Sequence, residues 1–173
     1  MENNNLILGI DPGNVETAFA LIDFSDGFKI YEKEKALNES VSLSLERIVK
    51  KYNVKHIGME MIASYGMAVG KSVFDTCVWI GRFMEQLEKL GVTPEYIYRI
   101  DEKTYICHDS RAKDANVRVA LIDRYAKFDF KNGKGTKKNP DTFYGVAKDI
   151  WAAVAVAVTY YEKNIREGGN TIT

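Results

Sequence analysis

The chain has 173 residues, of which 46% are hydrophobic and 28% are charged. These values are typical of one soluble globular domain spanning residues 1–173, and no apolar run reaches the roughly 20 residues of a transmembrane helix. The net charge is zero, which argues against a uniformly basic nucleic-acid-binding protein. The first residues, MENNN, carry no signal-peptide pattern, so the expected location is cytoplasmic.

The basic charge is concentrated in one part of the chain. Residues 99–138 carry 11 basic and 6 acidic side chains, whereas residues 1–98 carry 10 basic and 14 acidic ones. The stretch KNGKGTKKNP, residues 131–140, lacks any apolar period and predicts a basic, mobile loop. Its lysines either contact DNA or are simply solvated; they are Lys131, Lys134, Lys137 and Lys138.

The first half of the chain alternates strand and helix patterns. The segments LILGID, VETAFALIDF and FKIYEKEKAL predict a three-stranded antiparallel meander with a Pro-Gly turn after the first strand. Apolar residues at helical spacing in 40–53 predict a helix, with Ser40 as its N-cap. The short apolar segment VKHIGMEMI, which ends that crossover, should be a buried strand parallel to the first.

The second half continues the alternation. Residues 72–91 predict a helix stopped by Gly91, and PEYIYRI, residues 94–100, predicts a fifth strand. Residues 114–126 and 142–165 predict two further helices, the last with a narrow alanine and valine face suited to close packing on a sheet. The fold class is therefore α/β, with a five-stranded mixed sheet flanked by helices.

Three acidic residues stand in apolar surroundings. Asp11 ends the first strand, Glu60 lies in the strand predicted to run beside it, and Asp149 precedes the apolar run of the last helix. Carboxylates held together at a sheet edge need an opposing charge, and their oxygens prefer Mg²⁺ or Mn²⁺. Such a site is typical of phosphodiester hydrolysis.

Each acid also has an ordinary explanation. Asp11 could belong only to an Asp-Pro-Gly turn, Glu60 could face water at its strand end, and Asp149 could lie on the solvated side of a helix. The combination, in the order strand, parallel strand, C-terminal helix, is what favours a catalytic centre.

With these motifs, GIDPG at 9–13, GMEMI at 58–62 and DIWAAVAVA at 149–157, the chain resembles the RuvC family of Holliday junction resolvases, phage type, in the ribonuclease H-like superfamily. The resemblance implies a Mg²⁺-dependent crossover junction endodeoxyribonuclease, with Mn²⁺ possible and two ions per site, acting as a homodimer on branched DNA. It makes Asp11, Glu60 and Asp149 the metal ligands and catalytic acids.

One family acid is missing. The family pattern places a second acid three residues into the last helix, where this chain has Ala152. Because residues three apart share one helix face, an acid there would have pointed at the same site. In this chain, the metal coordination that such an acid would provide is left to water, to Asp149 alone or to another group such as Asp141.

The resemblance also assigns DNA-contacting residues. Lys103 and Lys113 match family lysines near the scissile phosphate, with Lys113 counted among the catalytic residues and Arg111 a similar phosphate contact. The family's junction-wedging aromatic is absent at Ala63, and Tyr65 or Met67 is the candidate substitute. Two alternatives stay open: a related nuclease acting on RNA, hybrids or flaps, and an inactive nucleic-acid-binding module.

Overall fold

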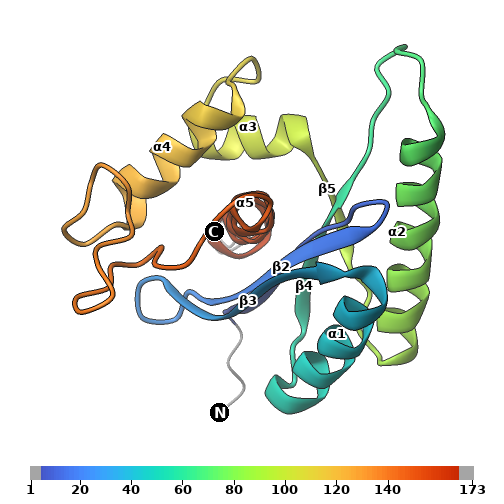
Figure 1. Cartoon of the computed structure of the whole chain (residues 1–173), viewed down its shortest axis with the longest axis horizontal. Helices are drawn as coiled ribbons and strands as arrows, with labels where there is room; N and C mark the ends of the chain where they lie inside the picture. The colour runs from blue at the N-terminus through green and yellow to red at the C-terminus, as the bar shows by residue number, and fades with distance from the viewer. Residues whose placement is uncertain (1–4, 168–173) are drawn as a thin grey trace, which may run out of the picture.

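The computed structural model describes residues 5–167, which form one mixed sheet with helices on both faces (Figure 1). Strands β1 (Leu6–Asp11), β2 (Glu16–Asp23) and β3 (Lys29–Leu37) make an antiparallel meander, as the sequence predicts. Helix α1 (Asn38–Tyr52) then crosses to β4 (His56–Met61), which pairs with β1 in parallel. Helix α2 (Lys71–Lys89) returns the chain to β5 (Glu95–Tyr98), and the strand order is β3-β2-β1-β4-β5.

The two faces of the sheet bury separate cores. Leu8, Ile10 and Phe19 point to one face, where α1 and α2 cover them. Ile7 and Ala20 point to the other face, toward α5 (Ile150–Tyr160). This alternation follows from the two-residue period of a strand, and it explains why β1 is apolar on both faces.

Helix α5 lies directly on the sheet and is covered on its outer side by α3 (Arg99–Cys107) and α4 (Asp114–Tyr125) (Figure 1). A Cβ atom at Gly9 would lie 2.1 Å from the carbonyl oxygen of Ala153, so only glycine permits this close approach. Residues Ala153–Thr159 are all buried, which exceeds the narrow apolar face that the sequence predicts.

Three local predictions are wrong. The last helix begins at Ile150 rather than near residue 142, because Gly145 and Lys148 have positive φ angles that no helix accommodates. The fifth strand ends at Tyr98, and α3, which the sequence analysis did not anticipate, begins at Arg99. Helix α1 begins before Ser40 and has no side-chain cap, while the buried Asn38 side chain donates to the Gly13 carbonyl oxygen.

The lysine-rich segment before α5 is a loop, as its composition predicts, and it contains many internal hydrogen bonds. The Asp141 carboxylate accepts backbone N–H groups of Lys127, Phe128 and Asp129, and Gly135 forms an isolated bridge with Pro140. Backbone hydrogen bonds that converge on the buried Asp141 carboxylate replace the apolar packing that the sequence lacks here.

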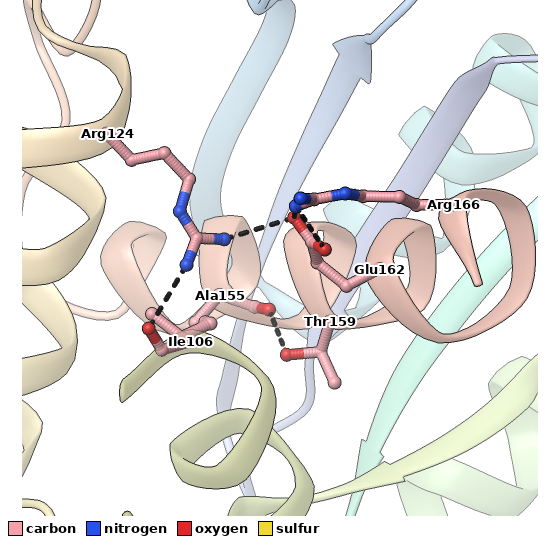
Figure 2. Close-up of polar contacts among 6 residues, drawn as sticks. All are labelled: Ile106, Arg124, Ala155, Thr159, Glu162 and Arg166. Atoms are coloured by element: carbon pink, nitrogen blue, oxygen red, sulfur yellow. Dashed lines mark hydrogen bonds and ion pairs between the residues drawn. The ribbon is translucent and has the colours of Figure 1, made fainter. Parts of the chain in front are cut away.

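After α5 the chain continues as a π-helical segment, η1 (Tyr161–Arg166), which is anchored by a buried carboxylate (Figure 2). Arg124 of α4 donates to Glu162 at 3.1 Å and to the Ile106 carbonyl oxygen at 3.2 Å, while Arg166 reaches Glu162 at 2.8 Å. The cluster thereby ties α3 and α4 to the C-terminal helix. Among the described residues, no helix is long and apolar enough to cross a membrane.

Candidate active site

The predicted acids Asp11 and Glu60 meet at one edge of the sheet. β1 and β4 run in parallel with Ile10 opposite Met59, so the next residue of each strand, Asp11 and Glu60, reaches the same edge. The sequence predicted this neighbourhood from the crossover connection, and the strand pairing confirms it.

The Asp11 carboxyl group has a strongly altered acidity. Burial raises its pKa to about 9, together with the charge of Glu60, a hydrogen bond to Glu60 and the charge of Asp149, while Arg99 acts in the opposite direction. The Oε2 atom of Glu60 is buried and has no hydrogen-bond partner among the described residues. A neutralising cation or proton is therefore needed where these two groups meet.

Arg99 supplies part of that positive charge. As the first residue of α3, it lies with Nε 3.4 Å from Glu60 Oε1 and with Nη1 3.2 Å from Glu102 Oε2. Glu102 is fully buried, and burial and the Glu60 charge raise its pKa against the influence of Arg99. Nothing in the sequence marks Arg99 as a site residue, because PEYIYRI has the pattern of one uninterrupted strand.

The third predicted acid, Asp149, approaches the same site but is held by another group. It occupies the N-cap position of α5, outside the helix proper, and its charge contributes to the raised pKa of Asp11. Its Oδ2 lies 2.6 Å from Nζ of Lys35, a residue of β3 that also pairs with Glu16 at 3.4 Å. Within residues 5–167 no three His, Cys, Asp or Glu side chains are grouped closely enough to hold a metal ion.

The donor chemistry nevertheless fits a hard divalent cation. Asp11 and Glu60 offer carboxylate oxygens, one of them buried and unpartnered, and Mg²⁺ commonly binds through one or two carboxylates and several waters. Asp149 would join them after leaving Lys35. The acid pair is thus the part of the predicted ligand set that the fold has already brought together.

A cavity of about 150 Å³ opens beside these acids. Asp11, Asp149 and Ala152 all line it. The side chain at position 152 therefore faces the same site as Asp149, as the helical spacing predicts. Asp114, at the start of α4, brings a further carboxylate to the same cavity and lies 3.9 Å from Arg99. Asp141 does not substitute for the missing acid, because its carboxylate is occupied by backbone N–H groups of the lysine-rich loop.

The basic residues that line the cavity differ from those that the resemblance assigned. They are Arg99, Arg118 and Lys148. Lys103 lies within α3, and Lys113 is the N-cap residue of α4, next to Asp114. Arg111 is exposed and pairs with Asp109 at 3.6 Å, and Tyr65 is 67% exposed in the loop after β4. DNA contacts by these four residues stay predictions.

The structure is similar to solved structures of RuvC and of a second Holliday junction resolvase over nearly its whole length, although no family model matches the sequence. Thermus thermophilus RuvC is 13% identical, with a TM-score of 0.70 over 94% of this chain and 96% of that one. This chain has the RuvC-type ribonuclease H-like fold. The same RuvC has also been solved in complex with a Holliday junction substrate, and that structure gives a TM-score of 0.71.

A second resolvase has the same RuvC-type fold. The yeast mitochondrial Holliday junction resolvase Ydc2 is 11% identical, with a TM-score of 0.63 over 98% of this chain and 83% of that one. Among curated proteins, the carbamoyl phosphate synthase large chain of Pasteurella multocida is 27% identical over 135 residues. This chain spans 11% of that relative's length, and the match does not place it in that family.

Proposed function

We propose that this chain is a divalent-metal-dependent, structure-selective endonuclease that cuts branched DNA such as four-way junctions. The observation that carries the proposal is the largely buried Asp11 and Glu60 pair at the ends of adjacent parallel strands, with Asp149 beside it, in a RuvC-type fold. The similar structures named as resolvases, including one with its junction substrate, support the choice of branched DNA.

The acids and the basic residues would divide the work. Asp11 and Glu60, joined by Asp149, would hold Mg²⁺ or Mn²⁺, which supplies an activated water and neutralises charge on the scissile phosphate. Arg99, Arg118 and Lys148 line the cavity and would bind and orient the phosphate oxygens. Lys113, adjacent to Asp114, would contact a flanking phosphate, as the family resemblance suggests. A second metal ion would lack one carboxylate ligand, because position 152 is alanine.

We further propose that the active form is a homodimer, because a four-way junction presents two symmetric strands to be cut. Helix α2 is the proposed interface. Its residues Ile80, Phe83 and Leu87 are buried in the core, whereas Phe74 and Val78 are exposed and would be available to a second copy. Sedimentation of the wild type beside a Phe74→Asp variant tests the interface.

The test of the function is a cleavage assay with four labelled substrates: a four-way DNA junction, a matched duplex, a flap and an RNA–DNA hybrid. We expect paired nicks across the junction that require Mg²⁺ or Mn²⁺ and are lost in Asp11→Asn. Asp26→Asn, a change of an exposed aspartate in the turn between β2 and β3, is the matched control and should cut normally. Cleavage of the hybrid or flap alone would favour the related-nuclease alternative, and no cleavage anywhere would favour the inactive binding module.

A further inference from the structure

The lysine loop, defined here as residues 127–144, is shaped in advance by two aspartates. Although burial opposes it, hydrogen bonds from backbone N–H groups hold the pKa of Asp141 well below its usual range. Asp129 accepts the backbone N–H groups of Asn132, Lys134 and Gly135. Both carboxylates are thus committed to the backbone of the loop, which fixes its conformation.

Glycines make this conformation possible. Gly133 and Gly135 have φ angles of +69° and +63°, in the left-handed region that disfavours side chains. A Cβ atom at Gly135 would lie 2.4 Å from the Asn139 carbonyl oxygen, and one at Gly133 would lie 2.7 Å from the Phe143 ring. The turn therefore accepts no other residue at these two positions without distortion.

The loop presents a mixed basic and aromatic surface. Phe130 is 60% exposed and Phe128 is 47% exposed, and neither ring belongs to the two described apolar cores. Four lysines lie in the same loop, and none forms an ion pair in the part of the chain that the structure describes; they are Lys131, Lys134, Lys137 and Lys138. Exposed aromatic rings beside unpaired cations are typical of surfaces that bind single-stranded nucleic acid.

A groove connects the loop to the candidate active site. It is lined by Lys131 and Asn132 from the loop, and by Asp114, Arg118, Lys148 and Trp151, four residues that also line the active-site cavity. The indole of Trp151 packs against Phe143 of the loop, with 4.8 Å between the ring centroids. The Arg118 guanidinium lies over the same indole, 4.9 Å from its centroid. Figure 1 shows the loop, in orange, next to the end of α4 and leading into α5.

We propose that the lysine loop is the binding site for an unpaired DNA segment at the branch: Phe130 stacks on an exposed base, the four lysines bind the flanking phosphates, and the groove leads that strand to Asp11. This proposal rests on the proposed function and deepens it, since it names the feature of branched DNA that is recognised. In a continuous duplex the base faces are already stacked, so the ring would gain nothing there. A preformed loop loses little conformational freedom on binding.

The test is equilibrium binding of the full chain, in EDTA to prevent cleavage, to three fluorescent probes: a junction with unpaired 2-aminopurine at the branch, a single strand and a matched duplex. Phe130→Ala should weaken binding to the junction and the single strand by about 5- to 150-fold, the range expected for one stacked base, and should abolish the fluorescence quenching of 2-aminopurine. Duplex binding should change less than about twofold. Phe130→Tyr should restore both signals.

The control is Leu43→Ala, which removes an exposed apolar side chain of α1, on the sheet face away from the loop.

A second pair of variants tests the lysines. Replacing the four loop lysines by glutamine should reduce the slope of log affinity against log salt for the single strand by about 3, at about 0.7 per phosphate contact. Replacing Lys29, Lys50, Lys55 and Lys89 instead should leave that slope nearly unchanged.

Equal effects of Phe130→Ala and Leu43→Ala on all three probes, with both variants folded by circular dichroism, would overturn the proposal. Equal losses on duplex and single strand would also overturn it, because they would indicate a phosphate-binding surface without base stacking. Its failure is distinguishable from failure of the proposed function. If the wild type cuts the junction and Phe130→Ala binds all probes as the wild type does, only the proposal for the loop is refuted. If binding depends on Phe130 but no substrate is cut, only the proposed nuclease function is refuted.

Discussion

The Asp11 carboxyl group lies beside Glu60 and remains protonated at neutral pH in the absence of a bound cation. Its pKa of about 9 reflects burial first and the neighbouring Glu60 second. In the unfolded chain the same group ionises near pH 4, so the folded state binds a proton that the unfolded state releases between these values. Deprotonation of Asp11 without a bound metal ion therefore lowers the free energy of unfolding.

The first prediction concerns this cost. Stability from a raised pKa is fully present below about pH 4 and is lost as pH rises through about 9, so the metal-free wild type should become less stable across that window. Asp11→Asn removes the ionisation and should gain about 1–3 kcal/mol over the wild type at about pH 8.5, as measured by urea unfolding in EDTA. Asp26→Asn should follow the wild type. Parallel stability curves for wild type and Asp11→Asn would contradict the Asp11 assignment.

A second prediction concerns the hold of Lys35 on Asp149. The ion pair of 2.6 Å holds the Asp149 carboxylate on Lys35, so a metal ion bound by Asp149 would have to compete with Lys35. Lys35→Met should lower the Mn²⁺ concentration for half-saturation by about threefold to tenfold, as measured by calorimetry without DNA. Lys29→Met, at the far end of β3, is the control. An unchanged or higher half-saturation concentration in Lys35→Met would mean that Asp149 is not a metal ligand.

The third prediction concerns the missing acid. Ala152 lines the cavity together with Asp11 and Asp149, so Ala152→Asp adds a carboxylate where the RuvC-family pattern has one. We expect a second Mn²⁺ equivalent in calorimetric titration, or about tenfold tighter binding of the first. Ala152→Asn, of the same size but uncharged, should give less than half of that gain. If the aspartate and asparagine variants titrate like the wild type, Asp114 or water already completes the coordination.

The sequence predicted the acid pair well because it depends on strand register alone. The crossover from the meander to VKHIGMEMI requires β4 to run parallel to β1, which puts Asp11 and Glu60 at one edge. The environment of Asp149 was not predictable in the same way. Its place at the start of α5 depends on the positive φ angles of Gly145 and Lys148, and its partner Lys35 lies on a strand over a hundred residues earlier.

Arg99 and the lysine loop show two further limits. PEYIYRI contains alternating apolar residues, so nothing within it separates β5 from α3. The carboxylate that caps the helix, Asp101, accepts the Tyr98 backbone N–H and lies just beyond this segment. The loop did carry a usable signal: aspartates at 129 and 141 flank a segment with glycines at 133 and 135. Aspartate near glycine commonly marks a side-chain-capped turn, but charge density alone suggested mobility.

The fourth prediction tests whether Asp141 orders the loop. Asp141→Asn retains the shape but loses charge and one acceptor oxygen, so several N–H groups of the loop should lose protection from hydrogen exchange by about tenfold or more. Because the folded pKa of Asp141 is lowered, its contribution is present above about pH 4 and is lost only as pH falls further. Exchange measured at about pH 7 therefore reports the full effect. Unaltered exchange of Lys127, Phe128 and Asp129 would show that packing of Phe143 suffices.

The last prediction concerns the buried carboxylate between two arginines. Glu162→Ala leaves Arg124, which is largely buried, without its carboxylate, and also removes the link from α4 to η1 (Figure 2). We expect a loss of about 2–3 kcal/mol in the free energy of unfolding. Glu85→Ala breaks an exposed pair with Lys89 on α2 and should leave the free energy of unfolding nearly unchanged. Because this cluster lies apart from the site, metal binding by folded Glu162→Ala should match the wild type; equal stability losses in the two variants would contradict its anchoring role.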